Sequence, residues 1–192
     1  MALAPNCANA HYVRAVVLHS MRMPERALEE CELATTLDRN LPSAHAYAGF
    51  MRLMIGRGEE TEPDIGEAIR LSPRDPALSS WYFWMGVANR YLGRFDRALE
   101  HLRRSVGTNP REPLAQFFLA AALASTGRLA EAAEARDAGL RLDPDVSIAK
   151  FIDERRSDHP VYLQQRERVY QGMRNPELPE KRREAGQSHT DR

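Results

Sequence analysis

LDPD at residues 142–145 is the last of five related stretches that divide this chain into segments of nearly equal length. The earlier four are LAPN at 3–6, LDRN at 37–40, LSPR at 71–74 and TNPR at 108–111. Their third residues are Pro5, Arg39, Pro73, Pro110 and Pro144, so the successive intervals are 34, 34, 37 and 34 residues. A fixed period of about 34 residues predicts a repeated helix–turn–helix unit.

Small residues recur inside each segment at matching places. We number each repeat so that the closing Pro, or Arg39 in its place, is position 32. Small residues are needed where two helix axes approach to roughly 8–10 Å, because larger side chains would hold the helices apart. Positions 8, 20 and 27 hold, in chain order, Ala15, Gly49, Gly86 and Ala120; Ala27, Thr61, Ala98 and Ala132; and Ala34, Ala68, Ser105 and Gly139.

A turn residue separates the two helices of each repeat. Position 15 is Gly in three repeats and Arg22 in the first, and Gly at this place ends a helix in the left-handed conformation. Asp75 before Pro76 predicts a helix start in the third repeat. The predicted helix pairs are 8–21 with 24–38, 42–55 with 61–72, 77–92 with 95–107, and 113–126 with 129–142.

These positions resemble the tetratricopeptide repeat, over roughly residues 8–144. The resemblance implies an all-α, right-handed solenoid of about four helix pairs, closed by a capping helical segment. Three residues depart from the family pattern: Arg39 replaces the closing Pro, Thr61 a small apolar residue, and Arg136 an aromatic. The predicted divisions are 1–7 as the tail of a missing upstream repeat, repeats at 8–41, 42–75, 76–112 and 113–144, a cap at 145–174, and a disordered tail at 175–192.

The opening LAPN is the closing stretch of a repeat that has no beginning in this chain. One interpretation is that an upstream repeat, and a longer protein, precede it. The other is that Pro5 caps the first helix. The sequence leaves both open.

A narrower resemblance concerns two segments, ALEECELATTLDRNLPSAHAYAGFMRLMIGRGEETEPDIGEAIRLSPRDP at 27–76 and SDHPVYLQQRERVYQGMRNPELPE at 157–180. They are similar to the C-terminal repeat region of bacterial class III adenylate cyclase-like proteins. That resemblance implies a regulatory or docking module in signal transduction. It transfers no catalytic residue, because a cyclase site lies in an α/β domain that this sequence does not contain.

Composition excludes several classes of partner. Lys plus Arg and Asp plus Glu both number 27, so no net charge steers the chain to nucleic acid or to an acidic membrane. The longest uncharged run, 113–127, is shorter than the roughly 20 residues of a spanning helix, and we interpret it as a buried helix. Cys7 and Cys31 form no metal or disulfide pattern. We expect a cytoplasmic protein.

No motif supports independent chemistry. His11 and His45 fall at position 4, beside the helix-packing seam, and we interpret them as structural. GRG at 56–58 is the repeat turn rather than a phosphate loop. We therefore predict a non-catalytic protein with no metal site and no cofactor.

The remaining candidate is the concave groove that the first helices line in this repeat family. The groove positions are mostly apolar and aromatic, which indicates an interface. The predicted partner-binding residues are Tyr12, Val16, Tyr47, Phe50, Phe83, Trp84, Val87, Tyr91 and Phe117. Three outcomes remain open: a partner helix or peptide binds there, the chain's own segment 160–174 fills the groove, or these residues are core.

We predict that the chain is a scaffold for an unidentified protein or peptide partner. The alternative is a detached or truncated regulatory region of a cyclase-like protein. Helix 8–21 has only a few residues before it where a cap is needed, so we also predict either low stability there or self-association.

Overall fold

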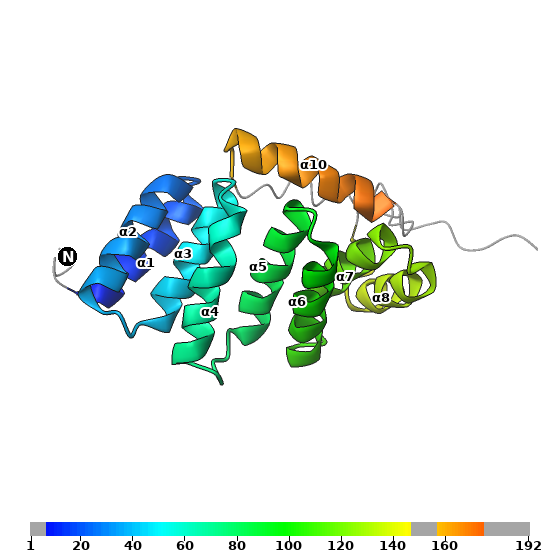
Figure 1. The fold of residues 1–192 in the computed structure, drawn as a ribbon, viewed down its shortest axis with the longest axis horizontal. Helices are drawn as coiled ribbons and strands as arrows, with labels where there is room; N and C mark the ends of the chain where they lie inside the picture. The colour runs from blue at the N-terminus through cyan, green and yellow to red at the C-terminus, as the bar shows by residue number, and fades with distance from the viewer. Residues whose placement is uncertain (1–6, 147–156, 175–192) are drawn as a thin grey trace, which may run out of the picture.

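The computed structural model describes residues 7–146 and 157–174, and it consists of paired helices stacked side by side (Figure 1). No strand occurs in those residues. The predicted all-α solenoid is confirmed. Its helices are α1 (Ala8–Ser20), α2 (Pro24–Leu37), α3 (Pro42–Met54), the 3-10 turn η1 (Gly58–Glu60), α4 (Thr61–Leu71), α5 (Leu78–Tyr91), α6 (Phe95–Thr108), α7 (Pro113–Ser125), α8 (Leu129–Leu142) and α10 (Pro160–Arg174).

The third helix pair accounts for the 37-residue interval between Pro73 and Pro110. The loop between α4 and α5 spans 72–77, two residues more than the loops at 38–41 and 109–112, and α5 has 14 residues where α3 has 13. α5 begins at Leu78, one residue after the predicted start at 77, and its N-cap is Ala77 and not Asp75. Asp75 instead stabilises the loop, where its Oδ1 accepts a hydrogen bond from the Ala77 N–H at 2.9 Å.

The turns inside each pair share one backbone conformation. Gly56, Gly93 and Gly127 have φ angles of 80°, 73° and 76°. Arg22, at the same position of the first repeat, has φ 60° and is the one described non-glycine residue with positive φ. A left-handed residue is thus required at position 15 of every repeat, and Arg22 adopts it at a conformational cost that glycine avoids.

The small residues at positions 8, 20 and 27 are all buried, and most of them are fully inaccessible. This burial holds even for the polar exceptions. Thr61 donates a hydrogen bond from Oγ1 to the Gly49 carbonyl at 3.0 Å, and Ser105 donates from Oγ to the Ser79 carbonyl at 2.9 Å. Because each hydroxyl has an acceptor, the close helix contact is kept without an unsatisfied polar group.

The first helices of the pairs form one face of the solenoid. α1 contacts α3, α3 contacts α5 and α5 contacts α7, whereas no two of α2, α4, α6 and α8 make comparable contact in the described chain. The first helices therefore lie on the inside of the curve. We call the surface made by α1, α3, α5 and α7 the inner face.

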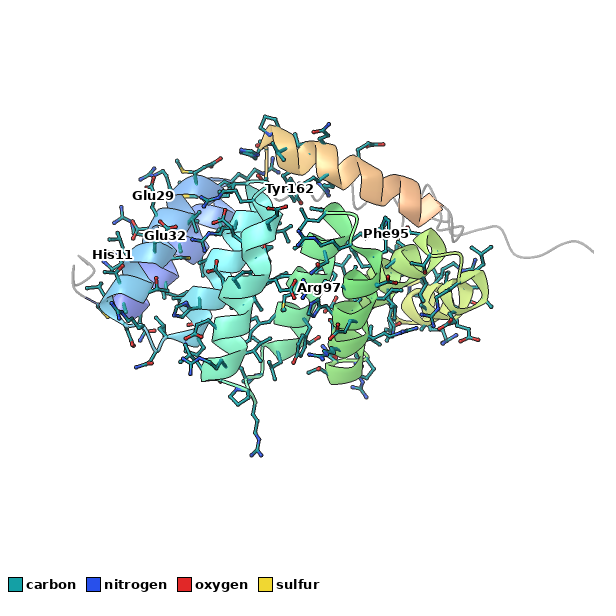
Figure 2. The ribbon with its side chains drawn as sticks, viewed as in Figure 1. His11, Glu29, Glu32, Phe95, Arg97 and Tyr162 are labelled. Carbon is teal, nitrogen blue, oxygen red and sulfur yellow. The ribbon has the colours of Figure 1, made fainter. Side chains whose placement is uncertain are left out.

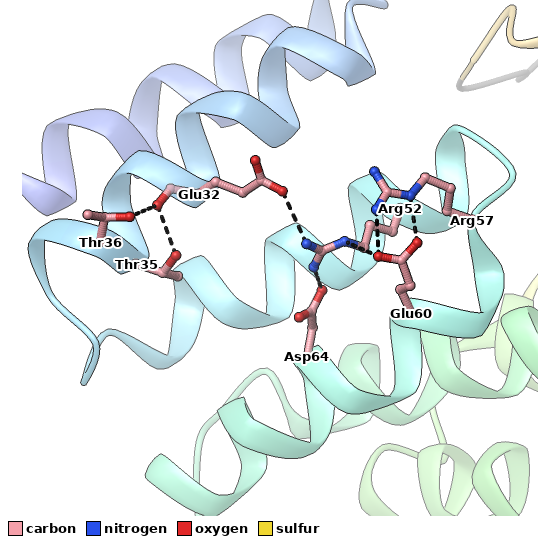
Figure 3. A network of polar contacts seen from close by, with 7 residues as sticks. All are labelled: Glu32, Thr35, Thr36, Arg52, Arg57, Glu60 and Asp64. Atoms are coloured by element: carbon pink, nitrogen blue, oxygen red, sulfur yellow. Dashed lines mark hydrogen bonds and ion pairs between the residues drawn. The ribbon is translucent and has the colours of Figure 1, made fainter.

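A polar network joins the first and second pairs on the side away from the inner face (Figure 3). Arg52 of α3 contacts Glu32 of α2, Glu60 and Asp64, so one half-buried guanidinium connects three helices. Burial raises the pKa of Asp64 above its ordinary value even though Arg52 opposes the shift. Arg57 donates two hydrogen bonds to the same Glu60 carboxylate. We interpret this network as structural.

Within the predicted cap, α10 lies across the ends of several helices near the turns inside the pairs (Figure 1). Its main contacts are with α7 and α5. The expectations for 1–6, for 147–156 and for the tail at 175–192 concern residues outside the described part of the chain.

The uncharged run at 113–127 forms α7, and most of its side chains are buried, as the sequence predicted. None of the described helices combines the length and apolar character that a membrane crossing requires.

Gly139 and Gly66 provide a matched test of close helix packing. A Cβ on Gly139 would collide with the Phe117 ring, which is 1% exposed, whereas a Cβ on Gly66 would meet no atom within 4 Å. We expect Gly139→Ala to lower the free energy of unfolding by about 1–3 kcal/mol. Gly66→Ala should raise it by about 0.5–1 kcal/mol, since alanine favours the helix.

Urea titration followed by circular dichroism measures both values. Equal effects of the two substitutions would mean that the α7–α8 contact is not as tight as the structure shows.

Candidate functional site

The nine predicted groove residues all lie on the first helices, but they differ widely in exposure. Val16 is 38% exposed. Four side chains are half-buried: Tyr12, Tyr47, Phe83 and Trp84. The other four are buried: Phe50, Val87, Tyr91 and Phe117. This last group therefore fits the third outcome that the sequence left open, since these four side chains belong to the core.

The half-buried aromatic side chains continue from one repeat to the next. The Tyr12 and Tyr47 rings meet edge to face with centroids 5.8 Å apart, and Tyr47 meets Trp84 in the same way at 6.3 Å. Trp84 stacks on Phe50 with centroids 4.3 Å apart and an interplanar angle of 9°. These contacts span α1, α3 and α5, so they fix three repeats relative to one another and leave part of each ring at the surface.

His19 belongs to this aromatic group and was missing from the predicted set. Its Nδ1 lies 2.8 Å from the Tyr47 hydroxyl, and its ring lies edge-on to Phe50 at 5.1 Å. Its repeat position, 12, is a groove position. The spacing could therefore have identified it.

A pocket of about 190 Å³ opens beside this aromatic group, at the N-terminal ends of α5 and α7. Phe83 and Trp84 form its apolar wall, and Ser80, Asn109 and Glu112 contribute polar groups. Such a mixture suits a medium-sized side chain of a bound peptide better than a free small ligand, for which pockets are usually larger and more apolar.

α10 covers the inner face at the C-terminal end of α5, where Tyr91 lies, and it also contacts α7. Tyr162 of α10 is 4% exposed and meets Tyr91 edge to face with centroids 6.2 Å apart. Figure 2 shows Tyr162 on the side of α10 that faces the helix pairs. Val161 lies so close to Gly56 that a Cβ there would collide with it. Of the three outcomes left open by the sequence, the structure thus contains two: core residues, and a groove partly occupied by segment 160–174.

Arg90 is a further buried group on α5, 6% exposed. Its Nη1 donates to the Ala121 carbonyl at 3.2 Å and to the Ser125 Oγ at 3.0 Å, and its guanidinium lies 6.0 Å from the Phe95 ring centroid. Its Nε has no hydrogen-bond partner, and no carboxylate forms an ion pair with it among the described residues. Burial lowers the pKa of Arg90 to about 10.

The interpretation of His11 and His45 as structural agrees with their contacts. His11 Nδ1 lies 2.6 Å from the buried Glu30 carboxylate, and His45 Nε2 lies 2.9 Å from the Arg39 carbonyl. No cluster of three or more potential metal ligands occurs among the residues that the structure describes.

The comparisons with known proteins agree with the repeat assignment. Residues 85–147 match the family model of the tetratricopeptide repeat. Among solved structures, a Pseudomonas aeruginosa pilF structure has a TM-score of 0.68 at 22% identity, with 90% of this chain and 80% of that chain covered. MamA from Desulfovibrio magneticus RS-1 gives 0.66 at 19% identity, with 92% and 99% covered.

A third solved structure is YrrB, described as a TPR protein with an unusual peptide-binding site. It gives a TM-score of 0.63 at 22% identity, with 87% of each chain covered. At these identities the likeness concerns the fold alone. This chain therefore has the fold of a tetratricopeptide repeat solenoid, and 85–147 also carries the sequence pattern of that family.

One curated relative is the probable biofilm formation methyltransferase WspC of Pseudomonas putida, 28% identical over 102 residues. The match covers 50% of this chain and only 24% of the relative. This chain thus spans about a quarter of the length of that protein.

Phe50 and Val16 both occupy position 9 of their repeats, so they allow a buried residue to be compared with an exposed one at the same repeat position. Phe50 is 4% exposed and Val16 is 38% exposed. We expect Phe50→Ala to lower the free energy of unfolding by about 3–5 kcal/mol, and Val16→Ala to change it by about 0.5 kcal/mol or less. Chemical unfolding measures both. A large loss for Val16→Ala would show that something covers α1 in solution.

Proposed function

We propose that this chain is a non-catalytic scaffold that binds a protein or peptide segment on the part of its inner face that α10 leaves uncovered. The observation that carries the proposal is the row of half-buried aromatic rings beside the pocket. Tyr12, Tyr47 and Trp84 are held rigidly by one another, so they present apolar surface with little rotamer entropy left to lose on binding.

The pocket next to Trp84 supports a peptide as the ligand. It lies between two first helices, which suits an extended or helical segment that follows the solenoid and inserts one side chain. Its polar groups include the Glu112 carboxylate, which already accepts a hydrogen bond from the Leu114 N–H. The description of YrrB as having a peptide-binding site is consistent with this use of the fold.

A second candidate is a regulatory region of a larger signalling enzyme. The sequence resemblance to cyclase-like proteins suggested it. The partial match to a protein named as a methyltransferase is a separate observation of a similar stretch in a longer protein, since the match covers 24% of that protein. On this view the same face contacts a catalytic domain instead of a free peptide.

A peptide selection tests the scaffold proposal. A random peptide library is selected against the full chain, and binders are then labelled with a fluorophore and measured by fluorescence anisotropy. We expect saturable binders whose affinity falls at least about tenfold on Trp84→Ala, as for a central aromatic contact. The control is Gln164→Ala, at an exposed position of α10. Binders whose affinity does not change on Trp84→Ala would contradict the proposed site.

We also propose that α1 mediates association between copies of the chain. Position 10 is Val17 in the first repeat, where it is 51% exposed, and Met51, Ala88 and Ala122 in the others, where it is at most 1% exposed. In those repeats the preceding helix pair covers this position. Val13 and Met21 extend the same exposed stripe along α1 at 51% and 61%.

Sedimentation velocity tests this association. We expect a concentration-dependent shift to a larger species, and Val17→Lys should weaken it by about tenfold or more, because a charge would enter an apolar contact. Leu129→Lys is the control, since Leu129 is 62% exposed but lies at the start of α8. A monomer at all concentrations would contradict the proposal.

A further inference from the structure

The side chains of α10 that the structure describes, at 160–167, place one fully buried aromatic group against the helices below. That group is Tyr162, whereas Val161 is 42% exposed and Leu163 is half-buried. Arg166, 9% exposed, lies with its guanidinium 5.9 Å from the Tyr162 ring. A peripheral helix with few buried apolar side chains opens more readily than the core, and Tyr162 is the described side chain on which this closure depends most.

The surface beneath α10, in contrast, is built like a binding site. Tyr162 joins the apolar cluster that contains Val87, Tyr91, Phe117 and Ala121, so its ring enters a recess formed by α5 and α7. The residues of this recess come from groove positions of the third and fourth repeats. The recess therefore accepts an aromatic side chain from a helix that crosses the ends of α5 and α7.

Arg90 reaches from α5 to α7 within this same region, since it bonds the carbonyl of Ala121. It is buried without a carboxylate partner in the described chain, and α10 gives it none. A buried guanidinium gains most from a charge-assisted hydrogen bond with a carboxylate. The occupant that α10 supplies thus fits the aromatic recess but leaves the cation without a counter-ion.

We propose that the α5–α7 recess is a second binding site for a partner helix, that α10 occupies it in the absence of that partner, and that the partner displaces α10. The partner is an amphipathic helix with an aromatic residue in the place of Tyr162 and an acidic residue within reach of Arg90. This inference rests on the proposed scaffold function and adds the class of ligand and its internal competitor.

A labelled peptide of residues 157–174 tests the proposal on the full chain by fluorescence anisotropy. Tethered α10 competes at an effective concentration of about a millimolar, so wild-type protein should bind the peptide poorly. Tyr162→Ala in the protein weakens this competitor and should improve peptide binding by about tenfold or more. Gln164→Ala, at an exposed position of α10, is the matched control and should behave as wild type.

The proposal that the partner helix places an acidic residue near Arg90 is tested with three further peptides. In each of them one residue, Leu163, Gln165 or Arg166, is replaced by Glu. At least one should bind the Tyr162→Ala protein about tenfold more tightly than the unmodified peptide. Arg90→Met in the protein should remove that gain. No gain with any of the three, or a gain that survives Arg90→Met, would overturn the assignment of an acidic helix.

Equal peptide binding by wild-type and Tyr162→Ala protein would overturn the competition itself, as would no binding to a folded Tyr162→Ala protein. If the Tyr162→Ala variant does not fold, hydrogen exchange of the wild-type protein provides the test. The amides of α10 should then exchange in an opening reaction during which the amides of α5 and α7 stay protected. Exchange of all three together would contradict the proposal. Because the probe is the chain's own helix, the result is independent of whether the peptide selection on the Trp84 side yields a ligand.

Discussion

The close approach of the two helices in each pair is the contact on which this structure depends. Positions 8, 20 and 27 are small and buried in all four repeats, and a left-handed residue at position 15 turns the chain from one helix to the next. With that spacing fixed, one pair can bury only part of its apolar surface alone, and the next pair must cover the rest. The solenoid is the result of repeating this contact.

The same constraint explains why the inner face combines buried and partly accessible aromatic residues. First helices contact one another across repeats, so their side chains either become core or remain half-buried at the surface. Phe50 and Phe117 are core, whereas Tyr47 and Trp84 remain partly accessible. Tyr162 of α10 covers the face at the C-terminal end of α5, and the pocket at the N-terminal ends of α5 and α7 stays open. The two binding surfaces proposed for this chain correspond to these two parts.

The repeat pattern predicted nearly all of the fold, because the period and the small residues are local signals that recur in every copy. It did not predict which groove residues are buried, because burial at position 9 depends on the neighbouring repeat: Val16 has no preceding helix pair in the structure and Phe50 has one. The recess for Tyr162 was also beyond prediction, since α10 leaves the repeat register and its contacts with α5 and α7 are non-local. The resemblance to cyclase-like proteins stays a prediction.

Hydroxyl-radical footprinting of the tyrosines tests the division of the inner face most directly. Tyr12 and Tyr47 are half-buried on its uncovered part, whereas Tyr91 of α5 and Tyr162 of α10 meet where the two helices pack together. The account predicts rapid oxidation of Tyr12 and Tyr47 in native protein, slow oxidation of Tyr91 and Tyr162, and equal rates for all four after denaturation. Native oxidation of Tyr91 as fast as that of Tyr12 would contradict it, because α10 would then not cover the face in solution.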